Sequence, residues 1–217
     1  MTLPVTHFSA EDFRDETNVS HETLDRLKIF AALLERWQAK MNLVGPGSMD
    51  EMWRRHFFDS AQLLPLVRAA HPDSENLLWL DLGSGAGFPG LVLAILGAGE
   101  VHLVESNGRK CAFLHQVIRE TGAAAVVHNA RSEDLPAMKP DVITSRALGD
   151  VEKILELGEK FLGAHTEIWL HKGQHIEKEL TRATISWIMQ VEKHPSRSDP
   201  SGTILCLKGI QRVENRP

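Results

Sequence analysis

The chain has only two cysteines among its 217 residues, Cys111 and Cys206, and neither lies in a C-x-x-C spacing. Both fall within helix or strand patterns, so we expect buried, reduced thiols and no disulfide. No apolar run approaches the ~18 to 20 residues that a membrane span needs, and the first residues lack the basic-then-apolar pattern of a secretion signal. These absences predict a cytoplasmic protein.

A strong excess of charge is also absent, because 24 lysines and arginines stand against 29 acidic residues and the formal net charge is −5. Such a balance argues against an avid, nonspecific binder of nucleic acid. Residues 1–18 are acidic, polar and aperiodic, which predicts a flexible tail in front of a single domain over 19–217. The remainder is near neutral, so the basic clusters at 54–56 and 108–110 remain candidates for phosphate contacts.

Helical patterns follow the acidic segment. Apolar residues recur at helical spacing over 21–40 and predict one amphipathic helix there. Ser48 and Glu51 have the spacing of a capping box, which predicts a second helix that begins at this point and breaks near Pro65. Residues 20–70 are therefore expected to form a helical cap that packs on the rest of the domain.

Seven short apolar runs have the length and composition of β-strands, at 77–82, 101–106, 124–128, 141–145, 166–172, 185–194 and 203–210. Helical segments lie between most of them, and strands separated by helices form parallel sheets with helices on both faces. The last two runs are joined by a short segment without a helix and are expected to form an antiparallel hairpin. The sequence predicts an α/β fold with a mostly parallel, seven-stranded, Rossmann-like sheet.

The stretch LDLGSGAGFPG over 80–90 places four glycines behind the first strand. Such a loop lets a ligand approach the backbone closely, because glycine adopts positive φ values that side chains resist. Its last three glycines satisfy the G-x-G-x-x-G pattern of dinucleotide enzymes. The frame D-x-G-x-G-x-G that begins at Asp81 fits better, because Pro89 stands where the dinucleotide helix should already run. That frame opens the fold of S-adenosylmethionine-dependent methyltransferases.

Acidic residues behind the next two strands bear on the same choice. Glu105 lies 20 residues after Gly85, where a carboxylate would accept the ribose hydroxyls of either cofactor. Ser132 and Glu133 follow the third strand, where methyltransferases of this kind hold the adenine edge. We therefore favour a methyltransferase over a dinucleotide oxidoreductase, while a catalytically silent RNA-binding or ribosome assembly factor remains a third alternative.

The chain as a whole also resembles a known family. The stretches WQAKMNL, RRHFFDS, LDLGSGAGFPGLVLAI, ARSEDLP, ITSRAL and LHKGQ follow, in order, the pattern of the bacterial small-subunit ribosomal RNA guanine-N7 methyltransferases, also called glucose-inhibited division protein B. The resemblance covers about residues 24–210. It implies a class I methyltransferase domain with added N-terminal helices that acts on one guanosine in the decoding-region loop of 16S RNA. Residues 1–18 and 186–203 match nothing in that pattern.

The resemblance also implies site residues, namely Gly83 and Phe88 in the loop, Ser132 and Glu133 after the third strand, and Arg146 after the fourth. With the residues that the loop pattern itself indicates, the expected cofactor-binding set is Asp81, Gly83, Gly85, Phe88, Glu105, Ser132, Glu133 and Arg146. The expected cofactor is S-adenosylmethionine, and the expected partner is small-subunit ribosomal RNA, free or within a subunit. We expect the protein to act as a monomer.

Residues after the fourth strand face the reactive methyl group in this fold. The segment TSRALGD contains neither the Asn-Pro-Pro-aromatic motif of exocyclic-amine enzymes nor the cysteine of pyrimidine-C5 enzymes. Guanine N7 carries an in-plane lone pair and no proton, so its methylation needs placement and electrostatics but no general base. Arg146 is the expected catalytic residue, because its planar fork suits either the cofactor carboxylate or guanine O6. A salt bridge to a helix acid such as Asp150 is the structural alternative.

Further candidates concern the RNA. His56 and Asp59 are three residues apart, and a bond between them would orient the imidazole toward the substrate, although an ordinary helix histidine is the alternative. Lys172 ends the fifth strand on the same edge as the glycine loop and is a candidate phosphate contact. Arg54 and Arg55 are similar candidates, and each of these cations has a solvated side chain as its alternative.

A metal site is not expected. His171 and His175 are four residues apart but lie on a strand-to-loop segment with no third ligand in view.

Overall fold

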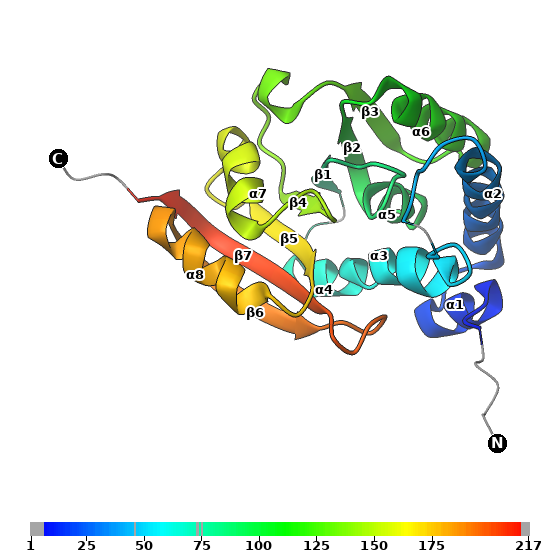
Figure 1. The fold of residues 1–217 in the computed structure, drawn as a ribbon, viewed down its shortest axis with the longest axis horizontal. Coiled ribbons are helices and arrows are strands. Elements are labelled where there is room, and N and C mark those ends of the chain that lie inside the picture. The colour runs from blue at the N-terminus through cyan, green and yellow to red at the C-terminus, as the bar shows by residue number, and fades with distance from the viewer. Residues whose placement is uncertain (1–6, 46, 73, 75, 214–217) are drawn as a thin grey trace.

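The structure is a computed structural model that describes residues 7–45, 47–72, 74 and 76–213. Its centre is a seven-stranded sheet of order β3-β2-β1-β4-β5-β7-β6 (Figure 1). The strands are β1 (Leu77–Leu82), β2 (Gly99–Glu105), β3 (Ala125–Asn129), β4 (Val142–Ser145), β5 (Glu167–Lys172), β6 (Trp187–Pro195) and β7 (Thr203–Arg212). Strands β1 to β5 pair in parallel, and β7 runs antiparallel to both β5 and β6. The expected fold is confirmed, including the C-terminal hairpin.

Helices cover both faces of this sheet. The helices are α1 (Ala10–Thr17), α2 (His21–Gln38), α3 (Asp59–Ala61), α4 (Leu63–Ala70), α5 (Gly90–Ile95), α6 (Gly108–Thr121), α7 (Val151–Gly158) and α8 (Ile176–Ser186). Side chains on neighbouring strand positions point to opposite faces, so Trp79 of β1 packs in the core under α2, α5 and α6, whereas Leu80 packs in the core under α7 and α8. Figure 1 shows α7 and α8 on the side away from α2 and α6.

The acidic segment before residue 19 is more ordered than the sequence predicts. Residues 1–6 lie outside the described residues, but 10–17 form α1, which begins with a capping box between Ser9 and Asp12. Phe13 is fully buried and its ring lies 5.6 Å from that of Trp53. The expectation of a flexible tail is therefore wrong for 10–17. An eight-residue helix with few buried side chains gives too little periodicity to be recognised among acidic residues.

The helical cap differs from the prediction in two ways. The predicted helix over 21–40 is confirmed as α2, but Ser48 does not cap a helix, because its hydroxyl donates to the carbonyl of Gly45. The following segment begins with a single π turn, Trp53–Phe58, and continues as α3 and α4. The break falls at Gln62 and not at Pro65, which lies in the first turn of α4, where a missing N–H costs little.

None of the helices within the described ranges combines the length and the apolar composition that crossing a bilayer would require.

Candidate active site

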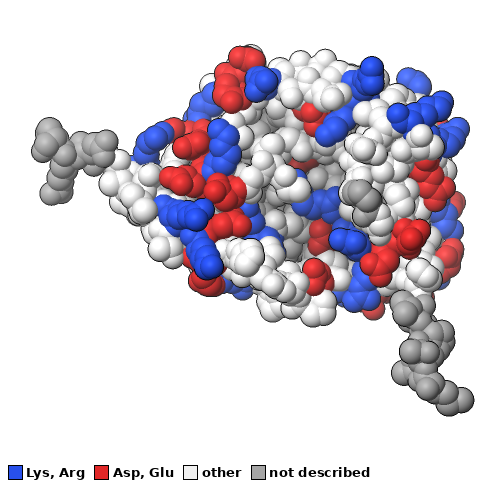
Figure 2. Space-filling view, in the orientation of Figure 1, with Lys and Arg blue, Asp and Glu red and all other residues white. Residues whose placement is uncertain are grey.

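Two adjoining hollows open beside the carboxyl ends of β1, β2 and β4, the edge at which doubly wound sheets bind ligands. The first, of about 470 Å³, is called the acidic hollow and is lined by residues that include Glu105, Ser132, Glu133 and Leu148. The second, of about 400 Å³, is called the arginine hollow and is lined by residues that include Arg55, His56, Gly85, Phe88 and Arg146. Gly83, Lys110 and Ala147 line both. Figure 2 shows the surface hollowed near the centre of the face in view.

The glycine loop separates β1 from α5 and borders both hollows. Gly83 has a φ of +69°, and a Cβ at this position would lie 2.6 Å from Cδ1 of Leu148. Gly85 also has a positive φ, +56°, but its Cβ would meet only a backbone oxygen at 3.7 Å. Any side chain at Gly83 would thus be strained and would press on the wall of the acidic hollow, so the loop leaves this space to a ligand.

Asp81, which was expected to bind the cofactor, lies beneath the loop. It is 1% exposed and its Oδ1 accepts a hydrogen bond from the Thr144 hydroxyl at 2.8 Å. Burial raises the pKa of Asp81 to about 6, although the hydrogen bond from Thr144 opposes the shift. A Cβ at Gly90 would come within 2.8 Å of its Oδ2. Asp81 therefore ties β1 to β4 under the loop and lines neither hollow.

Acidic and polar side chains line the first hollow as the sequence predicts. Glu105 accepts the backbone N–H of Gly85 at 3.0 Å and that of Asn107 at 2.7 Å, one on each carboxylate oxygen. Each oxygen keeps a further lone pair, which leaves acceptors for a diol. Ser132 donates to Glu133 at 2.9 Å, and hydrogen bonds from its own backbone and from Ser132 lower the pKa of Glu133.

Arg146 lies at the centre of a half-buried polar network in the second hollow. Its Nη1 donates to the carbonyl of Arg55 at 2.9 Å and to Oδ2 of Asp59 at 3.3 Å, and its Nη2 donates to Nδ1 of His56 at 2.9 Å. The guanidinium also lies 5.0 Å from the centre of the Phe88 ring. The salt bridge to a helix acid that was the structural alternative is thus present, but with Asp59, the first residue of α3, and not with Asp150, which caps α7.

His56 does not bond to Asp59 as predicted. Because arginine only donates, Nδ1 of His56 must accept, so its proton lies on Nε2 and is donated to the Ser48 hydroxyl at 2.9 Å. Burial and the nearby charges of Arg146 and Arg55 lower the pKa of His56 to about 3. The ring is therefore neutral and has one fixed tautomer, and it stacks 5.1 Å from the Phe88 ring.

Comparison with known proteins identifies this arrangement. The family model for rRNA small subunit methyltransferase G (GidB) matches residues 23–204. The chain belongs to this family. Ribosomal RNA small subunit methyltransferase G of Rhodospirillum centenum is 50% identical over 208 residues, which cover 96% of this chain and 94% of the relative. The protein of the same name from Rhodospirillum rubrum is 50% identical over 203 residues, which cover 94% and 98%.

Solved structures show the same class I methyltransferase fold at low sequence identity. A mutant of MtNAS in complex with S-adenosylmethionine is 15% identical, with a TM-score of 0.58 over 92% of this chain and 84% of that one. TYW2 of M. jannaschii in complex with AdoMet is 17% identical, with a TM-score of 0.52 over 70% and 76%. The family match makes the chain an S-adenosylmethionine-dependent methyltransferase, and its fold agrees with this, so the dinucleotide alternative is not supported.

The two hollows fit that cofactor. The acidic hollow has open space beside Gly83, unused carboxylate lone pairs on Glu105, and polar groups on Ser132 and Glu133, a set that is chemically compatible with a ribose diol and an adenine edge. Within the ranges that the structure describes, no group of three or more histidine, cysteine, aspartate or glutamate side chains is placed to hold a metal ion.

Asp59, which was expected to orient His56, pairs with Arg146 instead and is itself held by several hydrogen bonds. Its Oδ1 accepts the Ser198 hydroxyl at 2.5 Å and the Gln62 amide at 2.9 Å, while its backbone carbonyl accepts Nε2 of His171 at 2.7 Å. The loop between β6 and β7 thus reaches back to the active site. This contact gives a structural role to part of the stretch 186–203, which matched no family pattern.

The remaining candidates for contact with RNA phosphates differ in how far the protein itself uses their charges. Lys172 donates to Glu179 at 2.8 Å and to the carbonyl of Gly149 at 2.7 Å, and its side chain is 7% exposed, which argues against the expected phosphate contact. Arg54 and Arg55 are both exposed, but Arg54 donates to the carbonyl of Ser198, whereas Arg55 lines the arginine hollow.

Two further residues line the hollows, of which the sequence indicated only the first. Lys110 lies in the first turn of α6 and borders both hollows. Ala147, directly after Arg146, has a φ of +60°. A non-glycine residue in this region is strained, and such strain collects at functional sites. The basic cluster at 108–110 pointed to Lys110, but nothing in the sequence marks Ala147.

Proposed function

We propose that the protein transfers the methyl group of S-adenosylmethionine to N7 of one guanosine in the decoding-region loop of small-subunit ribosomal RNA. The family to which the chain belongs supports methylation of small-subunit rRNA. The choice of the N7 atom rests on the chemistry of the arginine hollow.

The observation that carries this choice is that the described residues of the arginine hollow offer no free base. Both nitrogens of His56 are engaged, and its pKa of about 3 leaves it without affinity for a proton at neutral pH. Exocyclic amines and hydroxyls must lose a proton when they are methylated, whereas N7 has none to lose. A site without a base therefore suits N7.

Cysteine chemistry is also disfavoured. Cys111 and Cys206 are both buried, and burial raises the pKa of each thiol. Cys111 donates to the carbonyl of Glu105 at 3.2 Å, and neither sulfur lines a hollow. A nucleophilic thiolate of the kind that pyrimidine-C5 methylation uses is thus not provided.

In the reaction, the protein's own residues bind the two ligands and orient them. S-adenosylmethionine supplies a methyl group on a sulfonium, which a lone pair can attack directly. Arginine has five N–H groups, and three of those on Arg146 are used within the protein, which leaves Nε–H and one Nη2–H for the hollow. These donors suit guanine O6, beside N7, or the cofactor carboxylate. Because Asp59 and His56 hold the fork, its orientation is set before the ligands arrive.

The direct test is methyl transfer with purified protein, radiolabelled S-adenosylmethionine and small-subunit RNA from a strain that lacks the enzyme. We expect one methyl group per RNA, at a guanosine of the decoding-region loop that then becomes sensitive to reduction and aniline cleavage. Nucleoside mass spectrometry that placed the methyl group on another atom would refute the N7 assignment alone. RNA binding without any transfer would instead favour a silent assembly factor.

A further inference from the structure

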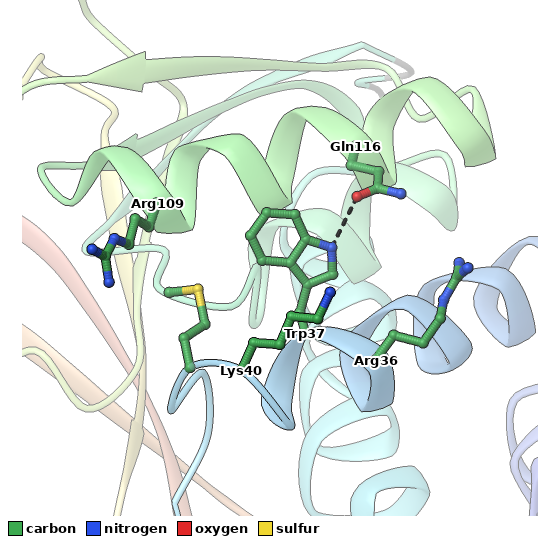
Figure 3. A pocket seen from close by; sticks show the side chains of 6 residues that line it. Arg36, Trp37, Lys40, Arg109 and Gln116 are labelled. Atoms are coloured by element: carbon green, nitrogen blue, oxygen red, sulfur yellow. Dashed lines mark hydrogen bonds between the residues drawn. The ribbon is translucent and has the colours of Figure 1, made fainter.

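A third hollow lies outside the active site, between the end of α2 and the first half of α6. It measures about 460 Å³ and is lined by Arg36, Trp37, Lys40, Met41, Arg109 and Gln116. Figure 3 shows the indole of Trp37 in the middle, with Arg36 and Arg109 toward opposite ends and Lys40 between them. We call this hollow the basic groove.

The cations of the basic groove are little used within the protein. Arg36, Lys40 and Arg109 are all exposed, and the nearest carboxylate to Arg36, that of Glu120, is 3.9 Å away. In the part of the chain that the structure describes, the side chains of Lys40 and Arg109 have no hydrogen-bond or ion-pair partner. Their positive charge is therefore available to an anion.

The aromatic floor of the groove is fixed. Nε1 of Trp37 donates to Oε1 of Gln116 at 2.9 Å, a bond that Figure 3 shows, and the ring meets Phe113 edge-on at 5.6 Å. The Gln116 amide in turn donates to Glu120 at 2.6 Å. A rigid aromatic surface between cations loses little conformational entropy when it binds. Aromatic rings flanked by cations are typical of grooves that track single-stranded nucleic acid.

The groove adjoins the arginine hollow. Arg109 lines the groove and its neighbour Lys110 lines the arginine hollow, while Met41 and Leu43, two residues apart, line one hollow each. Figure 2 shows lysine and arginine side chains gathered over the part of the surface formed by α2 and α6. An RNA strand that leaves the arginine hollow therefore meets this groove next.

We propose that the basic groove binds the sugar-phosphate backbone of the RNA strand that flanks the target nucleotide. This inference rests on the proposed function and extends it, because it names where the substrate lies beyond the reacting base. Contacts of this kind position RNA without reading its sequence. The protein as a whole has a net charge of −5 and does not attract a polyanion. RNA is therefore attracted only to local clusters of cations such as this one.

The test compares two pairs of cations with the same spacing. Arg36→Gln with Lys40→Gln, called the α2 pair, removes one charge in the last turn of α2 and one directly after it, four residues apart. Lys178→Gln with Arg182→Gln, called the α8 pair, removes two exposed charges four residues apart on α8. Arg109→Gln is tested alone. Each protein is assayed for S-adenosylhomocysteine affinity, for methyl transfer to small-subunit RNA, and for RNA affinity from 50 to 300 mM salt.

We expect the α2 pair to raise the KM for RNA roughly ten-fold with little change in kcat or in S-adenosylhomocysteine affinity. The slope of log affinity against log salt becomes shallower by about 0.7 to 1.4, because each lost phosphate contact removes about 0.7. Arg109→Gln should produce a smaller change of the same kind, and the α8 pair should change neither the KM nor the slope.

The outcomes separate the two proposals. A parent protein that methylates small-subunit RNA, with α2 variants of unchanged KM and salt slope, would overturn the groove alone. An equal rise in KM for the α8 pair would also overturn the groove proposal. So would a rise in KM that the α2 pair shows only with assembled subunits, because that result would point to a protein partner. A parent that transfers no methyl group to any small-subunit RNA would overturn the proposed function and this inference with it.

Discussion

The acidic hollow and the arginine hollow share an edge of the sheet but are built in different ways. The first is made of a glycine loop and of side chains that follow directly on β2 and β3, such as Glu105 and Ser132. The second depends on a network in which Arg146 joins residues from the π turn, while the β6–β7 loop supports Asp59. Local backbone shape sets the first hollow, and contacts between distant segments set the second.

This difference predicts that substitutions in the two hollows affect different kinetic quantities. A change in the acidic hollow alters space or acceptors that the cofactor needs, so it should act on cofactor affinity. A change in the network alters the direction of Arg146, so it should act on turnover and leave cofactor affinity nearly intact.

The largest effect is expected at the loop. Gly83→Val places a β-branched residue at positive φ with its Cβ against Leu148, so S-adenosylhomocysteine binding should be lost in calorimetry and methyl transfer with it. Gly122→Ala is the matched control, because Gly122 has a φ of +64° and no atom within 4 Å of the added Cβ. It should cost about 1 kcal/mol of stability and no cofactor affinity. Full binding by Gly83→Val would contradict the role of the loop.

Arg146→Ala is the corresponding change in the other hollow. We expect kcat to fall about 100-fold with S-adenosylhomocysteine affinity within a few-fold of the parent, because Arg146 lines the arginine hollow and not the acidic hollow. Arg146→Lys should not restore kcat, since an ammonium cannot reach Arg55, Asp59 and His56 together in one plane. A comparable loss of cofactor affinity would assign the free donors to the cofactor carboxylate.

Glu105→Ala tests the acceptors of the acidic hollow. S-adenosylhomocysteine affinity should fall by roughly 1.5 to 3 kcal/mol, which is about ten- to more than a hundred-fold, as charge-assisted hydrogen bonds are lost. Glu100→Gln, on the same strand with its side chain 68% exposed, is the control and should bind as the parent does. Unchanged affinity in folded Glu105→Ala would remove this residue from the site.

The pH dependence separates stability from turnover. The folded-state pKa of His56, about 3, lies below its ordinary value of 6.5, so its stabilising contribution is complete above pH 6.5 and is lost as the pH falls toward 3. Each pH unit in this window should cost up to about 1.4 kcal/mol, and His56→Gln should flatten that part of the urea-unfolding profile. Because no base takes part, kcat should stay level between pH 7 and 8.5. A kcat that rose with pH around pH 7 would indicate a general base.

The smallest effect is expected when the hydrogen bond from Ser198 to Asp59 is removed. Ser198→Ala removes one hydrogen bond to this carboxylate, and at about 1 kcal/mol it should lower kcat roughly five-fold without changing cofactor affinity. Ser198→Thr keeps the hydroxyl and should recover most of the loss. Ser201→Ala, at an exposed position in the same loop, should leave kcat unchanged.

The local hollow is also the one that the sequence predicted well. Gly83, Glu105, Ser132 and Glu133 follow strands whose apolar patterns are clear, and their spacing along the chain is enough to place them at one edge. Asp81 was misplaced, because its position in the same motif does not reveal that the loop turns away and leaves it buried.

The network could not be predicted in this way. Arg146 was singled out, but its partners lie 87 to 91 residues away in the sequence, and no spacing rule connects them. The bond expected between His56 and Asp59 assumes an α-helix, whereas a π turn closes i to i+5, so three residues fall well short of one turn. The two side chains do not bond to each other, and both contact the guanidinium of Arg146 instead.

The contact between Ser198 and Asp59 spans 139 residues of sequence, and this separation orders events while the chain is being made. At ~5 to 20 residues per second, Ser198 leaves the ribosome's catalytic centre on the order of ten seconds after Asp59. The glycine loop and Glu105 are both synthesised within that interval. Every residue that lines the acidic hollow is therefore synthesised before Ser198, so the network that orients Arg146 is the last part of the site for which the chain is available.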